Sequence, residues 1–102
     1  MGDEQQRVAD RFLGLLRPIE HDLEVYCRRM IWKPEDAADA LQNAVLRAFA
    51  AFDRYHDGAS FRAWMFRILT NEIFTLNRKY GRIAQKKAPD LVIPHTADTW
   101  QV

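Results

Sequence analysis

The chain has 102 residues, of which 48% are hydrophobic and 28% charged, and its formal net charge is +1. This suits one small domain and excludes a membrane-spanning chain, because no apolar run approaches the ~18 residues that a bilayer requires. The N-terminus has no signal-peptide pattern, so we expect a cytoplasmic protein. The single cysteine excludes an intrachain disulfide and argues against a metal site, so we expect neither metal nor cofactor.

The first predicted helix covers residues 5–31. Its apolar residues recur at steps of three or four, which is the period of a helix with one buried face. Pro18 interrupts the pattern, because proline lacks the backbone N–H and crowds the previous turn. We therefore expect either a kink or two short helices that meet near Arg17.

The second predicted helix covers residues 34–53. Pro34 suits the first helical position, and the acidic residues that follow it oppose the positive end of the helix dipole. Several alanines lie on its apolar side, so we expect a close approach to a neighbouring helix. The apolar stripe consists of Ala37, Ala40, Leu41, Ala44, Val45, Ala48, Phe49 and Phe52.

A second face of the same helix carries residues at i, i+3, i+4 and i+7, which lie on one side. One apolar contact rimmed by hydrogen-bonding groups would suit a protein-docking patch. Taken alone, the pattern fits an ordinary solvated surface better, since single exposed leucines are common. The residues are Asp39, Gln42, Asn43 and Leu46.

Residues 53–60 are predicted to form a loop. Asp57-Gly58 is a turn signal, and Ser60 suits the N-cap of the next helix. Arg54, Tyr55 and His56 can stack or form hydrogen bonds, as in a recognition loop. The alternative is a polar connection in which Tyr55 folds partly onto the core.

The third predicted helix covers residues 61–81. Its apolar stripe leaves a second side that mixes aromatics, amides and arginines, a combination suited to unpaired nucleic acid. In the alternative interpretation, the phenylalanines of that side pack under the first helix. The residues are Phe66, Thr70, Phe74, Asn77 and Arg78, with Arg67 and Asn71 at the margins.

Positive charge gathers in residues 61–88, which hold seven basic residues and one acidic residue, Glu72. Such a segment is typical of a polyanion-binding face or, more simply, of a solvated helix surface. From Arg82 onward the apolar period is lost and prolines appear. We therefore expect a helical domain over residues 1–82 and a linker or tail over residues 83–102, with a short helical start at 83–87.

No strand pairs or internal repeats are present, so the predicted fold class is all-α, a compact three- to four-helix bundle. The sequence also lacks a glycine-rich phosphate loop, a recognisable catalytic triad and paired carboxylates in an apolar setting. We therefore expect no enzymatic activity.

Two ordered motifs stand out in the sequence: residues 34–49 are PEDAADALQNAVLRAF, and residues 60–68 are SFRAWMFRI. The first resembles the helix E-D-A-x-D-L-x-Q-x-x-F-L-R-A-W of extracytoplasmic-function (ECF) sigma factors of the sigma-70 family, and the second matches their motif S-F-x-x-W-L-x-R-I. Asp53-Arg54-Tyr55 matches the D-R-F between them. The resemblance covers residues 8–82 and implies region 2, the promoter-melting domain.

The resemblance implies two partners, with an anti-sigma factor as a further candidate. Asp39, Gln42, Asn43 and Leu46 would dock on the clamp helices of the largest catalytic subunit of core RNA polymerase. The loop would capture a base flipped from the non-template strand of the minus-ten promoter element, and the third helix would line the separating strands and hold phosphates. The implied DNA-binding residues are Arg54, Tyr55, His56, Asp57, Gly58, Ser60, Phe61, Arg67, Thr70, Asn71, Phe74, Arg78, Lys79 and Arg82.

The chain departs from the family pattern at Ala40, where leucine is usual, and at Asn43, where glutamate is usual. We expect these changes to weaken or retune the polymerase contact. Nothing after Arg82 resembles the helix-turn-helix domain (region 4) that follows in the family, so we expect an excised domain rather than a chain that acts without that half. The alternative function is a sigma-like bundle that binds polymerase or an anti-sigma factor without touching DNA.

Overall fold

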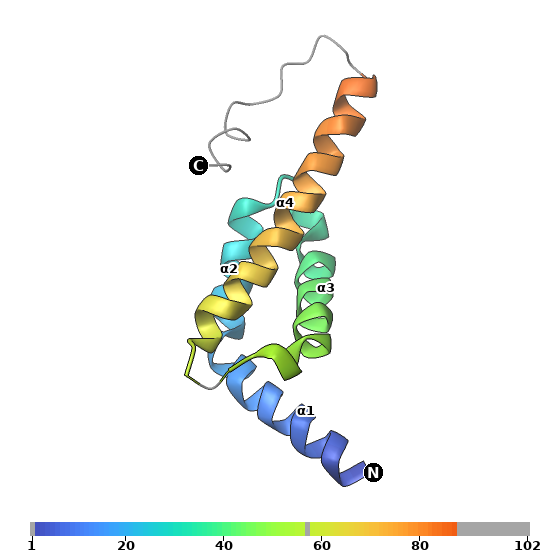
Figure 1. Cartoon of the computed structure of the whole chain (residues 1–102). Helices are drawn as coiled ribbons and strands as arrows, with labels where there is room; N and C mark the ends of the chain where they lie inside the picture. Colours follow the sequence, from blue (N-terminus) through green and yellow to red (C-terminus); the bar gives the residue numbers. More distant parts are fainter. Residues whose placement is uncertain (1, 57, 88–102) are drawn as a thin grey trace.

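The computed structural model describes residues 2–56 and 58–87, and every element in these ranges is helical (Figure 1), which confirms the predicted all-α bundle. No helix in the described part of the chain is long and apolar enough to cross a membrane. In chain order the elements are α1 (Gly2–Leu16), a 3-10 turn (Arg17–Ile19), α2 (Glu20–Met30), a 3-10 turn (Pro34–Asp36), α3 (Ala37–Ala50), a 3-10 turn (Phe52–Arg54) and α4 (Phe61–Lys87).

The first predicted helix is divided at Pro18, which lies in the 3-10 turn between α1 and α2. Of the two arrangements that the sequence allowed, two helices is the one that forms. In Figure 1, α1 points away from the group formed by α2, α3 and α4, and α4 lies beside both α2 and α3. α4 is therefore covered on two sides.

The alanine stripe of α3 lies in the core. Ala40, Ala44 and Ala48 have no exposed surface. Their short side chains allow α3 to approach α4 closely, as the sequence predicted. The family that the sequence resembles usually has leucine at the position of Ala40. Because Ala40 is buried, this difference affects packing in the core rather than the exposed surface of α3.

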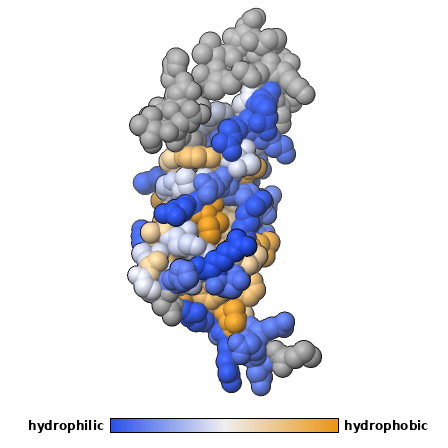
Figure 2. Space-filling view, in the orientation of Figure 1, coloured by the Kyte–Doolittle hydropathy of each residue, from blue (hydrophilic) through white to orange (hydrophobic). Residues whose placement is uncertain are grey.

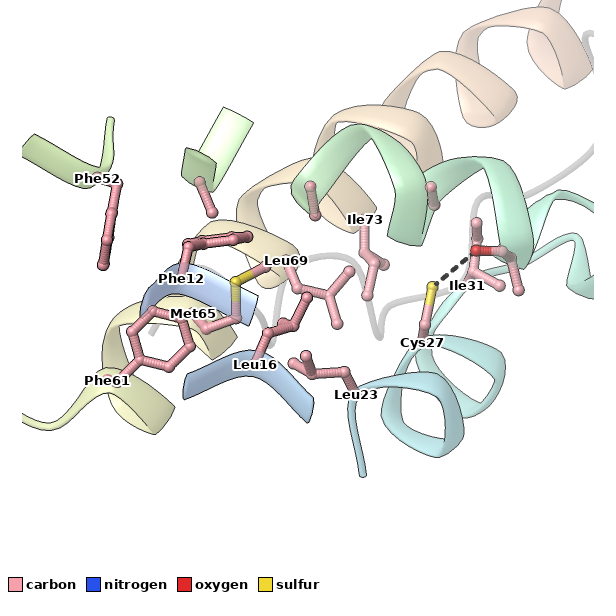
Figure 3. Close-up of a cluster of buried hydrophobic side chains, with 14 residues drawn as sticks. Phe12, Leu16, Leu23, Cys27, Ile31, Phe52, Phe61, Met65, Leu69 and Ile73 are labelled. Atoms are coloured by element: carbon pink, nitrogen blue, oxygen red, sulfur yellow. Dashed lines mark hydrogen bonds between the residues drawn. The ribbon is translucent and has the colours of Figure 1, made fainter. Parts of the chain in front are cut away.

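The core lies where α1, α2 and α4 meet beneath the alanine stripe (Figure 3). Leu23 and Cys27 of α2 face Leu69 and Ile73 of α4, and all four side chains are fully buried. Cys27 Sγ donates a hydrogen bond to the Ala37 carbonyl at 3.4 Å, and burial raises the pKa of this thiol. Cys27 is thus a small core residue rather than a reactive one.

Helix α4 begins as predicted but ends later. Ser60 Oγ accepts a hydrogen bond from the Ala63 N–H at 3.1 Å, which confirms Ser60 as the N-cap. The helix then continues through Gly81 to Lys87, so the expected end at residue 81 is wrong. A single glycine costs a helix only about 1 kcal/mol, and the next proline is Pro89. The start of the predicted linker is therefore a continuation of α4, and residues 88–102 lie outside the described residues.

Asn77 belongs to the core and not to the exposed side of α4 where the sequence pattern placed it. Its side chain is 2% exposed and lies against the α2–α3 connection. Its Nδ2 donates to the Met30 carbonyl at 3.1 Å, and its Oδ1 accepts from the Trp32 N–H at 3.0 Å. Asn77 therefore forms hydrogen bonds with two backbone groups at the end of α2.

Replacing Asn77 with alanine should lower the free energy of unfolding by about 1–3 kcal/mol, because two backbone groups lose their partners in a buried site. Urea denaturation would measure the loss. Thr75→Ala is the control, since Thr75 is exposed and bonds only to Asn71 of its own helix. Equal losses in the two variants would show that the Asn77 bonds are unimportant.

Candidate functional site

The residues predicted to dock on a protein partner lie together on the exposed side of α3. Gln42 and Asn43 are exposed at its middle, and Leu46, one turn further, is 60% exposed. We call this surface, made of Asp39, Gln42, Asn43 and Leu46, the docking face. A leucine with this much surface in water, beside two amides, is a suitable anchor for a protein contact.

Phe49 extends this surface beyond what the sequence indicated. It belongs to the predicted apolar stripe, yet it is 42% exposed, and its ring packs edge-to-face with that of Phe12 of α1 at a centroid distance of 5.3 Å. Phe49 lies one turn after Leu46 on α3. The family-like motif marked Phe49 as apolar, but no feature of the sequence distinguished its exposed position from a buried one.

An acidic residue of α4 contacts the docking helix, a feature that the sequence analysis missed. Glu72 is 9% exposed, and its carboxylate lies 2.9 Å from Arg47 Nε and 3.5 Å from Asn43 Nδ2. The signal that could have revealed it is charge, because Glu72 is the one acid within the basic segment. The family that the sequence resembles usually has glutamate at the position of Asn43, and that glutamate would place a second carboxylate beside Glu72.

Tyr55 holds the loop onto the core. Its ring lies 5.4 Å from the rings of Phe61 and Trp64, and its hydroxyl donates to the Ala59 carbonyl at 2.8 Å. The alternative in which Tyr55 folds partly onto the core therefore describes the structure. In this arrangement Tyr55 supports the loop, and most of its ring is not available to a base.

The rest of the loop divides into supporting and exposed residues. Phe61 is 7% exposed and packs among the aromatic rings, so the structure places it in the core rather than on a DNA-facing surface. Ser60 caps α4. Arg54, His56 and Gly58 are exposed, and Asp57 lies outside the described residues.

The mixed aromatic side of α4 is largely covered by α2. The Phe66 ring contacts the Tyr26 ring edge-on at 5.3 Å, and Thr70 Oγ1 shares a hydrogen bond with the Tyr26 hydroxyl at 2.8 Å. Phe74 is half-buried. For Phe66, this matches the alternative in which it packs under the first predicted helix, here its α2 part.

The basic residues of α4 that the resemblance assigned to DNA lie on the surface, as does Asn71. Hydrophilic side chains are prominent on the face shown in Figure 2, with apolar ones between them. The positive charges of these residues are therefore exposed and available to a polyanion. The exposed residues are Arg67, Asn71, Arg78, Lys79 and Arg82.

The C-terminal part of α4 is tied to the start of α3. Tyr80 donates a hydrogen bond to Asp36 Oδ2 at 2.6 Å, and Lys33 Nζ lies 4.8 Å from the centre of the Tyr80 ring. Burial, and then the hydrogen bond and the negative charge of Asp36, raise the pKa of Tyr80 to about 12. The phenol therefore remains a donor at neutral pH and connects the basic end of α4 with the docking helix.

Comparison with known proteins gives one family match. The family model described as Sigma-70 region 2 matches residues 15–83. ECF RNA polymerase sigma factor SigG of Mycobacterium tuberculosis (strain CDC 1551 / Oshkosh) is 36% identical over 64 residues, which are 63% of this chain and 17% of SigG. SigW of Bacillus subtilis (strain 168), also an ECF RNA polymerase sigma factor, is 30% identical over 81 residues, which are 79% of this chain and 40% of SigW. No solved structure matches significantly.

Proposed function

We propose, because this chain belongs to the sigma-70 region 2 family, that it binds core RNA polymerase and recognises and melts the minus-ten promoter element. The family is non-catalytic, and its members act through contacts with polymerase and promoter. The chain spans less than half of the length of the relatives named above. That it acts as a whole sigma factor does is therefore something we propose.

The observation that carries the proposal is the presence of two chemically different exposed surfaces on packed helices. α3 presents the docking face with its exposed Leu46, and α4 presents the basic residues. The first surface suits a protein partner, and the second suits the phosphates of a nucleic acid. A protein that brings promoter DNA to polymerase needs both surfaces held in a fixed relation.

For polymerase, we propose that the docking face binds the clamp helices of the largest catalytic subunit. Leu46 would enter an apolar site, and the neighbouring polar groups would form hydrogen bonds around it. This function would be carried out in the cytoplasm, where polymerase and promoter meet.

For DNA, we propose that the loop receives the extruded non-template base and that α4 holds the strand. Extruding a base costs a few kcal/mol, which stacking and hydrogen bonds from the loop must offset. Arg54 and His56 are the exposed loop side chains that can supply them, with Tyr55 as their support. Asn71 and the cations of α4 would contact the rest of the single strand.

A second candidate function is binding to polymerase or an anti-sigma factor without DNA contact. The observation that favours it is the internal use of residues assigned to DNA: Tyr55, Phe61 and Thr70 all have partners within the fold. Salt-dependent binding of a single-stranded minus-ten oligonucleotide separates the two functions, because phosphate contacts weaken as salt rises.

Leu46→Ala should weaken binding to core RNA polymerase by about tenfold or more, as expected for loss of an interface anchor worth above about 1.4 kcal/mol. The free energy of unfolding should change by no more than about 0.5 kcal/mol, because the side chain is mainly exposed. The measurement is a titration of labelled chain with purified core enzyme.

Leu13→Ala is the matched control, since Leu13 is another exposed leucine but lies on α1, away from the docking face. If both substitutions weakened polymerase binding equally, the docking face would have no special role in it. A loss of thermal stability comparable to that of a core substitution would show that the Leu46 face is buried in the working protein.

A further inference from the structure

Arg47 is held in an unusual way for a surface arginine. Its Nε lies 2.9 Å from Glu72 Oε1, while 72% of the arginine side chain remains exposed and only 10% of the Glu72 side chain does. In the ion pair between Arg28 and Glu24, by contrast, both side chains are exposed and the distance is 3.5 Å. Arg47 is therefore fixed at one end by a nearly buried carboxylate of a different helix.

This arrangement leaves the outer part of the guanidinium group oriented and accessible. A guanidinium has five N–H donors in a rigid fork, of which the Nε group supplies one. The two Nη groups carry the other four, and 72% of the side chain to which they belong is exposed. A second carboxylate could bind them through two hydrogen bonds without first having to order the arginine.

Arg47 also borders the docking face. It follows Asn43 by one helical turn, and both side chains donate to the same carboxylate of Glu72. A shallow groove of about 300 Å³ lies beside the pair, with Ile68 and Ala51 as its apolar part. Asn71 and Thr75 of α4 also line the groove, which offers room for one further side chain beside Arg47.

We propose that Arg47 binds an acidic side chain of the protein partner of the docking face, and that Glu72 is the residue that positions Arg47 for this contact. The proposal rests on the proposed function, in which that partner is core RNA polymerase. A protein carboxylate is favoured over a DNA phosphate because Arg47 shares its anchor with Asn43 of the docking face. The exposed cations assigned to DNA lie on the loop and on α4 instead.

The test measures binding of the chain to purified core RNA polymerase. Arg47→Ala should weaken binding about tenfold, as for other arginines central to interfaces. Arg47→Lys should lose most of the same affinity, because it keeps the charge but has neither the Nε tether nor the fork. Arg28→Ala is the matched control, being an exposed, ion-paired arginine on α2, and should bind like the unmodified chain.

The positioning role of Glu72 is tested by a double-substitution cycle. Glu72→Gln should weaken polymerase binding by about threefold, and Arg47→Ala should cost less in the Glu72→Gln background than in the unmodified chain, because the two residues act as one unit. Thermal unfolding of each variant separates the positioning role of Glu72 from a purely structural one. If Glu72→Gln lowers the melting temperature and leaves polymerase affinity unchanged, the positioning role is wrong.

The outcomes also separate this inference from the proposed function. If the unmodified chain does not bind core polymerase, the proposed function is wrong and the inference loses its basis. If the chain binds and Leu46→Ala weakens binding while Arg47→Ala does not, the inference alone is wrong. A loss of affinity for single-stranded DNA in Arg47→Ala, with polymerase binding intact, would assign Arg47 to a phosphate and overturn the choice of partner.

Discussion

Leu69→Ala should lower the free energy of unfolding by about 2–5 kcal/mol, the range observed for truncating a fully buried leucine. Leu69 has no exposed surface and lies at the centre of the cluster in Figure 3, between Met65 and Ile73 of its own helix and close to Leu16 of α1. A domain of this size is stable by about 5–15 kcal/mol, so this one change removes a large share of the total.

The size of the loss depends on whether the site can collapse. Leu69 lies on the helix that packs against both α2 and α3, and the neighbouring side chains are held from several directions. We therefore expect limited relaxation and a remaining cavity, which adds to the lost burial of apolar surface.

Urea denaturation of Leu69→Ala beside Leu46→Ala gives the sharpest comparison. The two variants have the same chemical change at 0% and 60% exposure. Leu46→Ala should unfold almost as the unmodified chain does, within about 0.5 kcal/mol. Equal destabilisation would contradict the burial of one leucine and the exposure of the other.

The helical period of the sequence located the elements and the exposed side of α3 well. α3 packs against α4 and α2 along its apolar stripe, and residues spaced by three and four along the opposite side share an exposed surface. For such a helix a single apolar stripe is enough to separate the buried side from the exposed one. This is why Gln42 and Leu46 could be placed without a structure.

The same reasoning was less successful for α4, because its two neighbours, α2 and α3, cover different sides of it. α3 covers one side, where Glu72 is buried, and α2 covers another, where Tyr26 contacts Phe66 and Thr70. A stripe pattern assigns one buried side to each helix. It therefore left open whether the phenylalanines of the second side pack, and it did not indicate that Asn77 is buried.

Polar residues in the core were the hardest to predict. Asn77 resembles a nucleic-acid-binding amide in the sequence, yet it satisfies a backbone N–H and a carbonyl where α2 ends. The need for these bonds arises from the chain reversal between α2 and α3, which is a tertiary feature. The sequence around Asn77 contains no local sign of it.

Simultaneous replacement of Arg78, Lys79 and Arg82 with alanine should reduce the affinity for single-stranded minus-ten DNA and flatten its salt dependence. Each phosphate contact on a single strand contributes roughly 0.7 to the slope of log affinity against log salt, so three lost contacts should reduce the slope by about 2. The three side chains are exposed on α4.

The same change made elsewhere provides the control. Arg17, Arg28 and Arg29 are also exposed, but they lie on the Arg17–Ile19 turn and on α2, so their replacement removes three charges without removing the proposed contacts. Affinities are measured between about 50 mM and about 200 mM salt, the range over which counterion release is most visible. Equal slopes in the two triple variants would mean that overall charge, and not the end of α4, attracts the strand.

The base preference distinguishes the phosphate contacts from the loop. The triple variant on α4 should weaken all oligonucleotides alike, because phosphates carry no sequence information. Preference among bases at the extruded position should therefore persist at reduced affinity. If the preference disappeared together with the slope, α4 and not the loop would read the base.

If the unmodified chain had no salt-dependent affinity for single strands, binding without DNA contact would be the function that remains, since the exposed positive charge of α4 would then have no phosphate to neutralise.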